Sequence, residues 1–143
     1  MISFKHTIVI VLSFISFMLK AQNADVYIMA GNAREELGDL AGALEQYTLA
    51  IEDDSTSSMA YFNRAFVKRK MNEYEGAILD YTMAIKFKPN YQIAYNNRGI
   101  VYMLLGKKEE ACADWKTAAE MGYPNAIKLL VDICNYKVDT IAK

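Results

Sequence analysis

The side chains that could carry out chemistry are few in this sequence of 143 residues. An enzyme needs a general base, an activated nucleophile or a metal ion, and histidine is the side chain best suited to act as a base at neutral pH. His6 is the only histidine, and the serine cluster at Ser55, Ser57 and Ser58 has no base beside it. Glycine-rich phosphate loops are absent from the sequence. The sequence therefore predicts a protein that is not an enzyme.

Paired carboxylates occur at Asp53-Asp54 and at Glu109-Glu110. They fall in a predicted loop and on a predicted helix face, where solvated charge is the ordinary role of an acidic pair. A small hydrolase that uses carboxylates would need two inward-facing acids with raised pKa values. No placement of these residues in the predicted helices supplies such a pair.

Cys112 and Cys134 are the only thiols. Two cysteines without a histidine do not complete a structural zinc site, so we expect no metal and no cofactor. Two interpretations of the pair stay open at this point. In an oxidising compartment the two could form a disulfide that holds the C-terminal helix, and otherwise they are small buried apolar side chains.

The N-terminal segment differs in composition from the rest of the chain. A short start with Lys5 precedes an uncharged apolar run of thirteen residues from Thr7 to Leu19. This order predicts a secretory signal peptide over residues 1–21, cleaved near Ala21. As a helix the run is about 20 Å long, shorter than the roughly 30 Å of a bilayer core. We therefore expect a secreted or periplasmic protein. The alternative is a membrane-anchored protein that retains residues 2–19 as an N-terminal helix.

The remaining chain has the composition of a small helical protein. The sequence is 53% hydrophobic and 23% charged, which is enough apolar material for a core. Abundant Leu, Ala, Met and Tyr with only two prolines favour helices over strands. The formal net charge of −1 lacks the basic excess that binding to a phosphate backbone requires, so we expect no nucleic acid partner.

A repeat with a period of thirty-four residues organises this helical part. The stretch GDLAGALEQYTLAI at 38–51 returns as NEYEGAILDYTMAI at 72–85. The alignment continues into a third copy without insertion or deletion. The aligned sets are Tyr27, Tyr61 and Tyr95; Gly31, Ala65 and Gly99; Gly38, Asn72 and Gly106; Ala43, Ala77 and Ala111; Tyr47, Tyr81 and Trp115; and Ala50, Ala84 and Ala118.

Each unit has the spacing of two amphipathic helices joined by a tight turn. Tyr61, Ala65 and Lys68 lie at i, i+4 and i+7 in the middle unit, and a second stripe follows after Asn72. Glycine at this turn in the outer units suits a left-handed residue that closes the first helix. The small residue of the first helix lets the large aromatic residue of the second helix approach closely. One such hairpin buries too little surface alone, so the units must stack.

This grid resembles the tetratricopeptide repeat in its period, its helix-turn-helix form and its order of large and small residues. Of the prolines expected near the end of each repeat, only Pro89 is present. The resemblance implies an all-α fold, an α-solenoid of three hairpins at 24–57, 58–91 and 92–125. Residues 126–143 have helical apolar spacing, and we expect them to form a C-terminal capping helix.

In this family the first helix of each hairpin lines a concave groove that binds a partner. The resemblance therefore places repeat positions 2, 5, 6, 9, 12 and 13 at the groove. These positions hold Asp25, Ile28, Met29, Asn32, Glu35 and Glu36; Met59, Phe62, Asn63, Phe66, Arg69 and Lys70; and Ile93, Asn96, Asn97, Ile100, Met103 and Leu104. Their apolar members are typical of a contact site, and the alternative is that they are buried in the core or covered by the signal segment or the last helix. The partner-binding residues we expect are Asn32, Phe62, Asn63, Phe66, Arg69, Asn97, Ile100 and Leu104.

The asparagines of the groove allow a more specific expectation. The amides of Asn63 and Asn97 could bond the backbone of an extended peptide, with local capping as the alternative. Some family members clamp the C-terminal carboxylate of cytosolic chaperones, and Asn32 and Asn63 match two asparagines of that clamp. Ile28, Ile93 and Asn97 stand where the clamp has Lys, Lys and Arg. Without these cations, no charge attraction offsets the free energy needed to remove a carboxylate from water, so we expect no such clamp.

The resemblance thus implies a non-catalytic protein-protein interaction module that binds a peptide or helix of a partner protein in the cell envelope. The alternative is a membrane-tethered assembly factor or scaffold with an uncleaved N-terminal helix.

Overall fold

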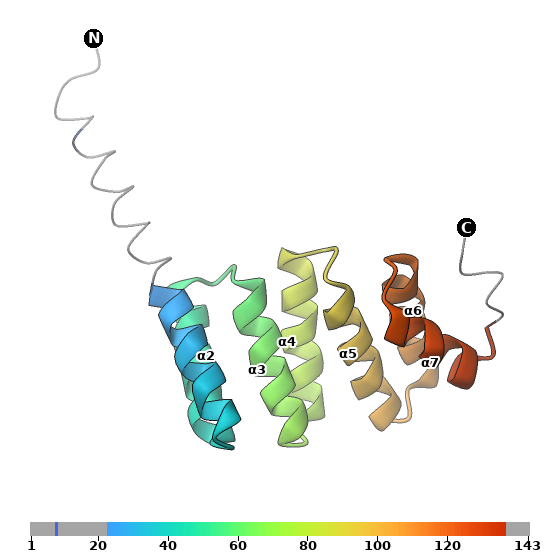
Figure 1. Cartoon of the computed structure of the whole chain (residues 1–143), viewed down its shortest axis with the longest axis horizontal. Helices are drawn as coiled ribbons and strands as arrows, with labels where there is room; N and C mark the ends of the chain where they lie inside the picture. The colour runs from blue at the N-terminus through green and yellow to red at the C-terminus, as the bar shows by residue number, and fades with distance from the viewer. Residues whose placement is uncertain (1–7, 9–22, 137–143) are drawn as a thin grey trace, which may run out of the picture.

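The computed structural model describes residue 8 and residues 23–136, and the region 23–136 consists of helices joined by short turns. Within these residues there is no strand, as the sequence predicts. The helices are residues 23–36, α2 (Leu40–Asp53), α3 (Ser58–Lys70), α4 (Tyr74–Phe87), α5 (Gln92–Leu104), α6 (Lys108–Glu120) and α7 (Pro124–Cys134). Most of the predicted signal segment, residues 1–21, lies outside the described residues. Figure 1 shows the helices side by side in chain order.

Each hairpin closes through one left-handed residue. Gly38, Asn72 and Gly106 have φ angles of 80°, 62° and 72°, and each is the second residue after the end of a first helix. Asparagine is the residue other than glycine that most readily adopts this conformation, which explains its place in the middle hairpin. The second helix then begins at once, as in α2, where the side chain of Asp39 accepts a 2.9 Å hydrogen bond from the Gly42 amide. The predicted turn is confirmed in all three hairpins.

The aromatic residue of each second helix fills the centre of its hairpin. Tyr47, Tyr81 and Trp115 are the three largest fully buried side chains. A Cβ atom at Gly31 would lie 2.5 Å from the Tyr47 ring, and one at Gly99 would lie 2.7 Å from the Trp115 ring. The small residue on the first helix is therefore a steric requirement of the hairpin, as the sequence predicts.

The hairpins share their cores with their neighbours, which makes the stack continuous. The first core cluster joins Tyr47 to Val67 of α3, and the next joins Tyr81 to Val101 of α5. The third joins Trp115 to Leu130 of α7. Each cluster thus includes a residue of the helix that follows its hairpin. The first helices also approach one another, because α3 contacts α5 directly.

A polar bridge that the sequence analysis overlooked joins neighbouring hairpins. Arg64 donates two 2.8 Å hydrogen bonds to the Asp80 carboxylate and a 3.3 Å bond to the Thr48 hydroxyl of the preceding hairpin. The same arrangement recurs at Arg98, whose partners are Asp114 and, in the preceding hairpin, Thr82. Asp80 and Asp114 are buried, and paired charges of this kind resist separation. The signal was present, since all three residues recur at the period of the repeat.

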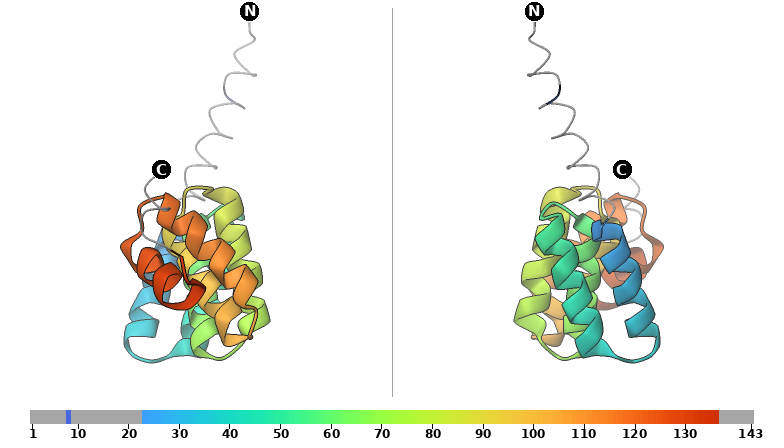
Figure 2. Two further views of the ribbon diagram at one scale, coloured as in Figure 1. Left: turned by 90° about the vertical axis from the view of Figure 1, so that its right-hand side faces the viewer. Right: turned by 90° about the vertical axis from the view of Figure 1, so that its left-hand side faces the viewer.

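The last helix, α7, packs on α6 and covers the C-terminal end of the stack (Figure 2). It begins at Pro124, two residues before the predicted start, because proline suits the first turn of a helix. It ends at Cys134, where Asn135 adopts a left-handed conformation with φ 57°. The expected helix over 126–143 is therefore shorter in the structure, and residues 137–143 lie outside the described part of the chain. A disulfide joins Cys112 to Cys134 with the Cα atoms 5.9 Å apart.

Candidate functional site

The first helices of the hairpins lie beside one another, since hydrogen bonds join residues 23–36 to α3 and α3 contacts α5. We call the side of these helices that carries the predicted groove positions the inner face. Hydrogen bonds between the first two of these helices join residues of the predicted groove. The Asn63 amide donates to Asn32 Oδ1 over 3.1 Å, and Lys70 Nζ lies 2.8 Å from Glu35 Oε1. Because all four residues occupy predicted groove positions, the structure brings the polar part of that set together in the first two hairpins.

Five of the nine exposed large hydrophobic side chains within residues 23–136 lie on this face. Met29 is 70% exposed, and Met59, Ile93, Met103 and Leu104 are also exposed large hydrophobic residues. All five occupy predicted groove positions, and they come from all three hairpins. Five exposed apolar side chains on one face are typical of a contact surface.

Repeat position 5 does not belong to this surface. Ile28 is buried in the first core cluster, and Asn96 is 5% exposed. Phe62, the third residue at this position, is half-buried, and its ring lies 5.7 Å from that of Tyr81 and 5.0 Å from that of Tyr91. The expectation that position 5 faces a partner was wrong for Ile28 and Asn96. Phe62 therefore packs between the second and third hairpins.

The asparagine amides bond within the protein. Asn63 bonds Asn32, as described above, and Asn97 Nδ2 donates to the Ile93 carbonyl over 2.9 Å. The Asn97 bond is local to α5, whereas the Asn63 bond joins two hairpins. Binding of a peptide backbone by these amides stays a prediction. Asn97 lies on the exposed side of α5, whereas the Asn32 oxygen also accepts a 2.7 Å bond from the Tyr47 hydroxyl.

Two cations stack on the ring of Phe66. The Arg69 guanidinium lies 4.8 Å and Lys70 Nζ 4.9 Å from the ring centre. Such contacts hold long cationic side chains against an aromatic surface and orient them. Phe66 and Arg69, both predicted groove residues, therefore form a cationic and aromatic patch at the end of α3.

The tyrosines behind this face differ in their hydroxyl partners. The Tyr47 hydroxyl bonds Asn32 Oδ1 and lies 3.4 Å from Glu35 Oε2, and burial together with the Glu35 charge raises its pKa. Burial also raises the pKa of Tyr81, which the nearby Arg69 guanidinium opposes. The Tyr81 hydroxyl and Arg69 Nε are both buried without a hydrogen-bond partner among the described residues.

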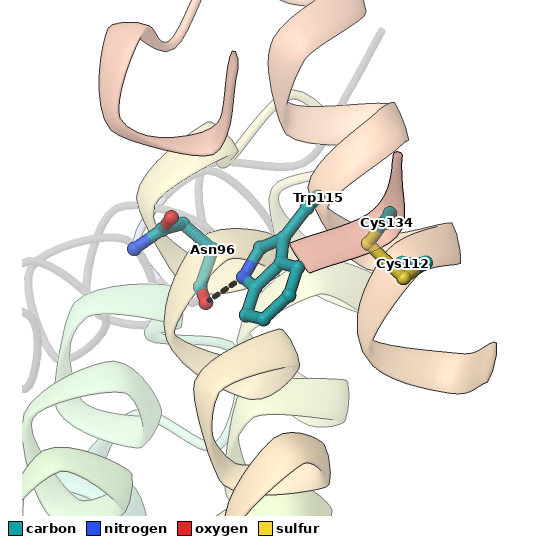
Figure 3. Close-up of a disulfide and its surroundings, with 4 residues drawn as sticks. All are labelled: Asn96, Cys112, Trp115 and Cys134. Atoms are coloured by element: carbon teal, nitrogen blue, oxygen red, sulfur yellow. Dashed lines mark hydrogen bonds between the residues drawn. A yellow bond between two sulfur atoms is a disulfide. The ribbon is translucent and has the colours of Figure 1, made fainter. Parts of the chain in front are cut away.

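An apolar cavity of about 200 Å³ lies where α5 meets α7. Its lining includes Ile100 and Leu104, so the structure separates these two predicted groove residues from the polar patch of the first two hairpins. The full lining is Ile100, Met103, Leu104, Trp115, Leu129 and Ile133. The Trp115 indole is fixed behind it by a 3.2 Å hydrogen bond to the Asn96 carbonyl, close to the disulfide (Figure 3).

Other kinds of site are not found in the described part of the chain. Residue 8 and residues 23–136 contain no group of three or more His, Cys, Asp or Glu side chains placed to hold a metal ion. No helix within these residues is both long enough and apolar enough to cross a bilayer.

Family models match most of the stack. A model described as TPR repeat matches residues 67–106, and a model described as tetratricopeptide repeat matches residues 24–55 and 93–121. The comparison with curated proteins finds no match.

Solved structures similar to this chain include TPR domains bound to peptides. The second TPR of Spaghetti (RPAP3) bound to the HSP90 peptide SRMEEVD is 33% identical, with a TM-score of 0.70 over 72% of this chain and 94% of that chain. The second TPR domain of human RPAP3 in complex with the HSP70 peptide SGPTIEEVD is 30% identical, with a TM-score of 0.73 over 85% and 99% of the two chains. The Arabidopsis OM64 TPR domain, 24% identical with a TM-score of 0.77 over 81% and 98%, shares the fold.

Proposed function

This chain belongs to the tetratricopeptide repeat family, and from this premise we propose that it is a non-catalytic protein-interaction module. It binds a peptide or a helix of a partner protein on the inner face of its three hairpins. The similar domains that were solved with HSP90 and HSP70 peptides support binding of this kind.

The five exposed apolar side chains of the inner face are the observation that carries this proposal. Met59 and Ile93 occupy the same position of adjacent hairpins and are 54% and 39% exposed. A peptide that follows the face from one hairpin to the next would cover both. Burial of exposed apolar area supplies affinity, and neighbouring polar groups orient the peptide.

The ligand is not an acidic chain terminus held in the manner of the chaperone clamp. That clamp requires cations where this chain has Ile28, Ile93 and Asn97. Ile28 is part of the core and is only 4% exposed, so even its position is closed to a ligand. The face therefore selects its partner through apolar contacts and through the patch at Phe66 and Arg69.

The cell envelope is the location we propose for this binding. The signal-like order of residues 1–21 supports export. The disulfide between Cys112 and Cys134 also supports an oxidising compartment, since such bonds are rare in the cytosol. In the alternative, the uncleaved N-terminal segment tethers the same binding face to the membrane as an assembly factor.

Peptide selection against the purified chain tests the proposed function. Peptides selected from a random display library on the wild-type chain should bind the Met59→Ser, Ile93→Ser double variant at least about tenfold more weakly, since two apolar contacts are lost. Leu79→Ser is the matched control, because Leu79 is 68% exposed but lies on α4, a second helix. Equal binding to all three proteins would count against the inner face as the binding site.

A further inference from the structure

The tyrosines of the first two hairpins differ in what the first helix offers to their hydroxyl groups. In the first hairpin the Tyr47 hydroxyl meets Asn32 and Glu35, which are repeat positions 9 and 12. Both offer oxygen atoms, so the hydroxyl proton has an acceptor. A buried phenol at this place therefore requires a hydrogen-bond acceptor at one of these two positions.

The second hairpin places no acceptor there. Its positions 9 and 12 are Phe66 and Arg69, an apolar ring and a side chain that only donates hydrogen bonds. Tyr81 is fully buried, and neither its hydroxyl proton nor Arg69 Nε has an acceptor among the described residues, although the guanidinium is close enough to the phenol oxygen to oppose the rise in the Tyr81 pKa. Two donors therefore meet with no acceptor for the phenol proton, which is an expensive arrangement inside a protein.

The charge of this region favours an anion. Three cations end α3, and two of them have partners, since Lys68 lies 2.8 Å from Asp80 and Lys70 lies 2.8 Å from Glu35. Arg69 has no carboxylate partner within residues 23–136. Its guanidinium is held on the Phe66 ring, and Arg69 as a whole is half-buried, although its Nε atom is covered.

Resting on the proposed function, we propose that Arg69 and Tyr81 form a subsite for the carboxylate of an Asp or Glu side chain within an apolar segment of the partner. The guanidinium and the phenol donate to the carboxylate oxygens, and no proton is transferred. The carboxylate belongs to a side chain rather than to a chain terminus, because exposed apolar residues lie on both sides of the second hairpin. Met29 precedes it and Ile93 follows it, so a peptide that uses both must continue past Arg69.

The first test compares two peptide pools on the full-length chain with its disulfide intact. Both pools are short capped peptides with Leu, Ile, Phe and Met around one central residue. That residue is Asp or Glu in the first pool and Asn or Gln in the second. We expect the acidic pool to bind about tenfold more tightly and to shift the Arg69 Nε–Hε NMR resonance, because charge-assisted bonds are stronger than neutral ones.

Two variants of equal charge identify the residue responsible. Arg69→Gln should abolish the preference for the acidic pool. Lys116→Gln, on the outer helix α6 and 52% exposed, should retain it. Equal binding of the two pools to the wild type would overturn the subsite and leave the proposed function standing. Absence of binding by either pool would overturn both. A stronger preference for a pool with a free terminal carboxylate would contradict the side-chain source.

A stability comparison tests the missing acceptor in the free protein. Tyr81→Phe removes a buried hydroxyl without a partner, so it should leave the melting temperature unchanged or raise it while reducing the preference for the acidic pool. Tyr47→Phe removes a hydroxyl with two acceptors, so it should lower the melting temperature. If both variants lower it equally, the Tyr81 hydroxyl is already satisfied in the free chain and the subsite is contradicted.

Discussion

Arg64 and Asp80 form two parallel 2.8 Å hydrogen bonds between the two helices of the middle hairpin. Lys68 Nζ lies 2.8 Å from the same carboxylate, so one buried acid pairs with two cations. A paired charge in such a place is costly to separate, although it adds less stability than its geometry suggests. The pair therefore fixes the position of one helix against the other, and it contributes little to the net free energy of folding.

Asp80→Ala should lower the free energy of unfolding by about 3 kcal/mol, because it leaves Arg64 and Lys68 without their partner in a poorly solvated place. Chemical denaturation of the purified chain measures this change. The control is Glu120→Ala, which removes the exposed contact with Lys116 at 3.9 Å and should change stability by less than about 0.5 kcal/mol. Similar losses in the two variants would show that burial of Asp80 is unimportant.

Gly99→Ala should destabilise the third hairpin by about 1–3 kcal/mol, because the new methyl group would overlap the Trp115 ring and approach the Ala111 carbonyl at 3.1 Å. Fluorescence of Trp115, the only tryptophan, should report a displaced ring. Gly76→Ala is the matched control, since its nearest neighbour is the flexible Lys68 side chain at 3.2 Å. That change should be neutral or should stabilise α4 by about 0.5–1 kcal/mol. An unperturbed Gly99→Ala protein would contradict the steric role of the glycine.

Reduction of the disulfide should lower stability by about 3 kcal/mol, because Cys112 and Cys134 are 22 residues apart and their bond restricts the unfolded chain. Denaturation with and without a dithiol reductant measures the loss. Hydrogen exchange should increase first in α7, which the bond holds against α6. The Cys112→Ala, Cys134→Ala double variant should not respond to the reductant. A wild-type chain that is equally insensitive would indicate that the cysteines are unbonded in solution.

The mature N-terminus separates the two proposed locations. If the signal segment is removed after Ala21, the protein purified from its native cells should begin at Gln22 and carry a net charge of −3, since Lys5 and Lys20 are lost. N-terminal sequencing together with intact mass measures this directly. Retention of residues 2–19, with the protein in the membrane fraction, would favour the tethered alternative.

The repeat made most of the fold predictable from the sequence. Tyr47, Tyr81 and Trp115 recur at one spacing, and the structure buries all three in equivalent places. The turn residues followed from glycine at two equivalent positions, and the structure gives Asn72 the same left-handed conformation. Periodic packing is repeated in each unit, so a single sequence carries three independent observations of it.

The residues of the inner face were less predictable, because helical periodicity identifies the face of a helix and does not show which positions at its border are exposed. Neighbouring residues of a helix differ by about 100° in direction, so a position at the edge can face the core in one hairpin and the groove in another. Ile28 and Asn96 are buried, and Phe62 is half-buried, although all three share one repeat position. The bond between Asn32 and Asn63 depends on the distance between two hairpins, which no local pattern contains.

The bridge from each arginine to the threonine of the preceding hairpin gives the array a fixed order of modules. The middle hairpin carries both halves of the bridge, Arg64 and Thr82, whereas the first hairpin has Ala30 where an arginine would be needed. A tandem duplication of residues 58–91 should therefore lengthen the array with every junction complete. A duplication of residues 24–57 should create one junction without its cation. Assembly of longer arrays from this chain thus depends on which segment is copied.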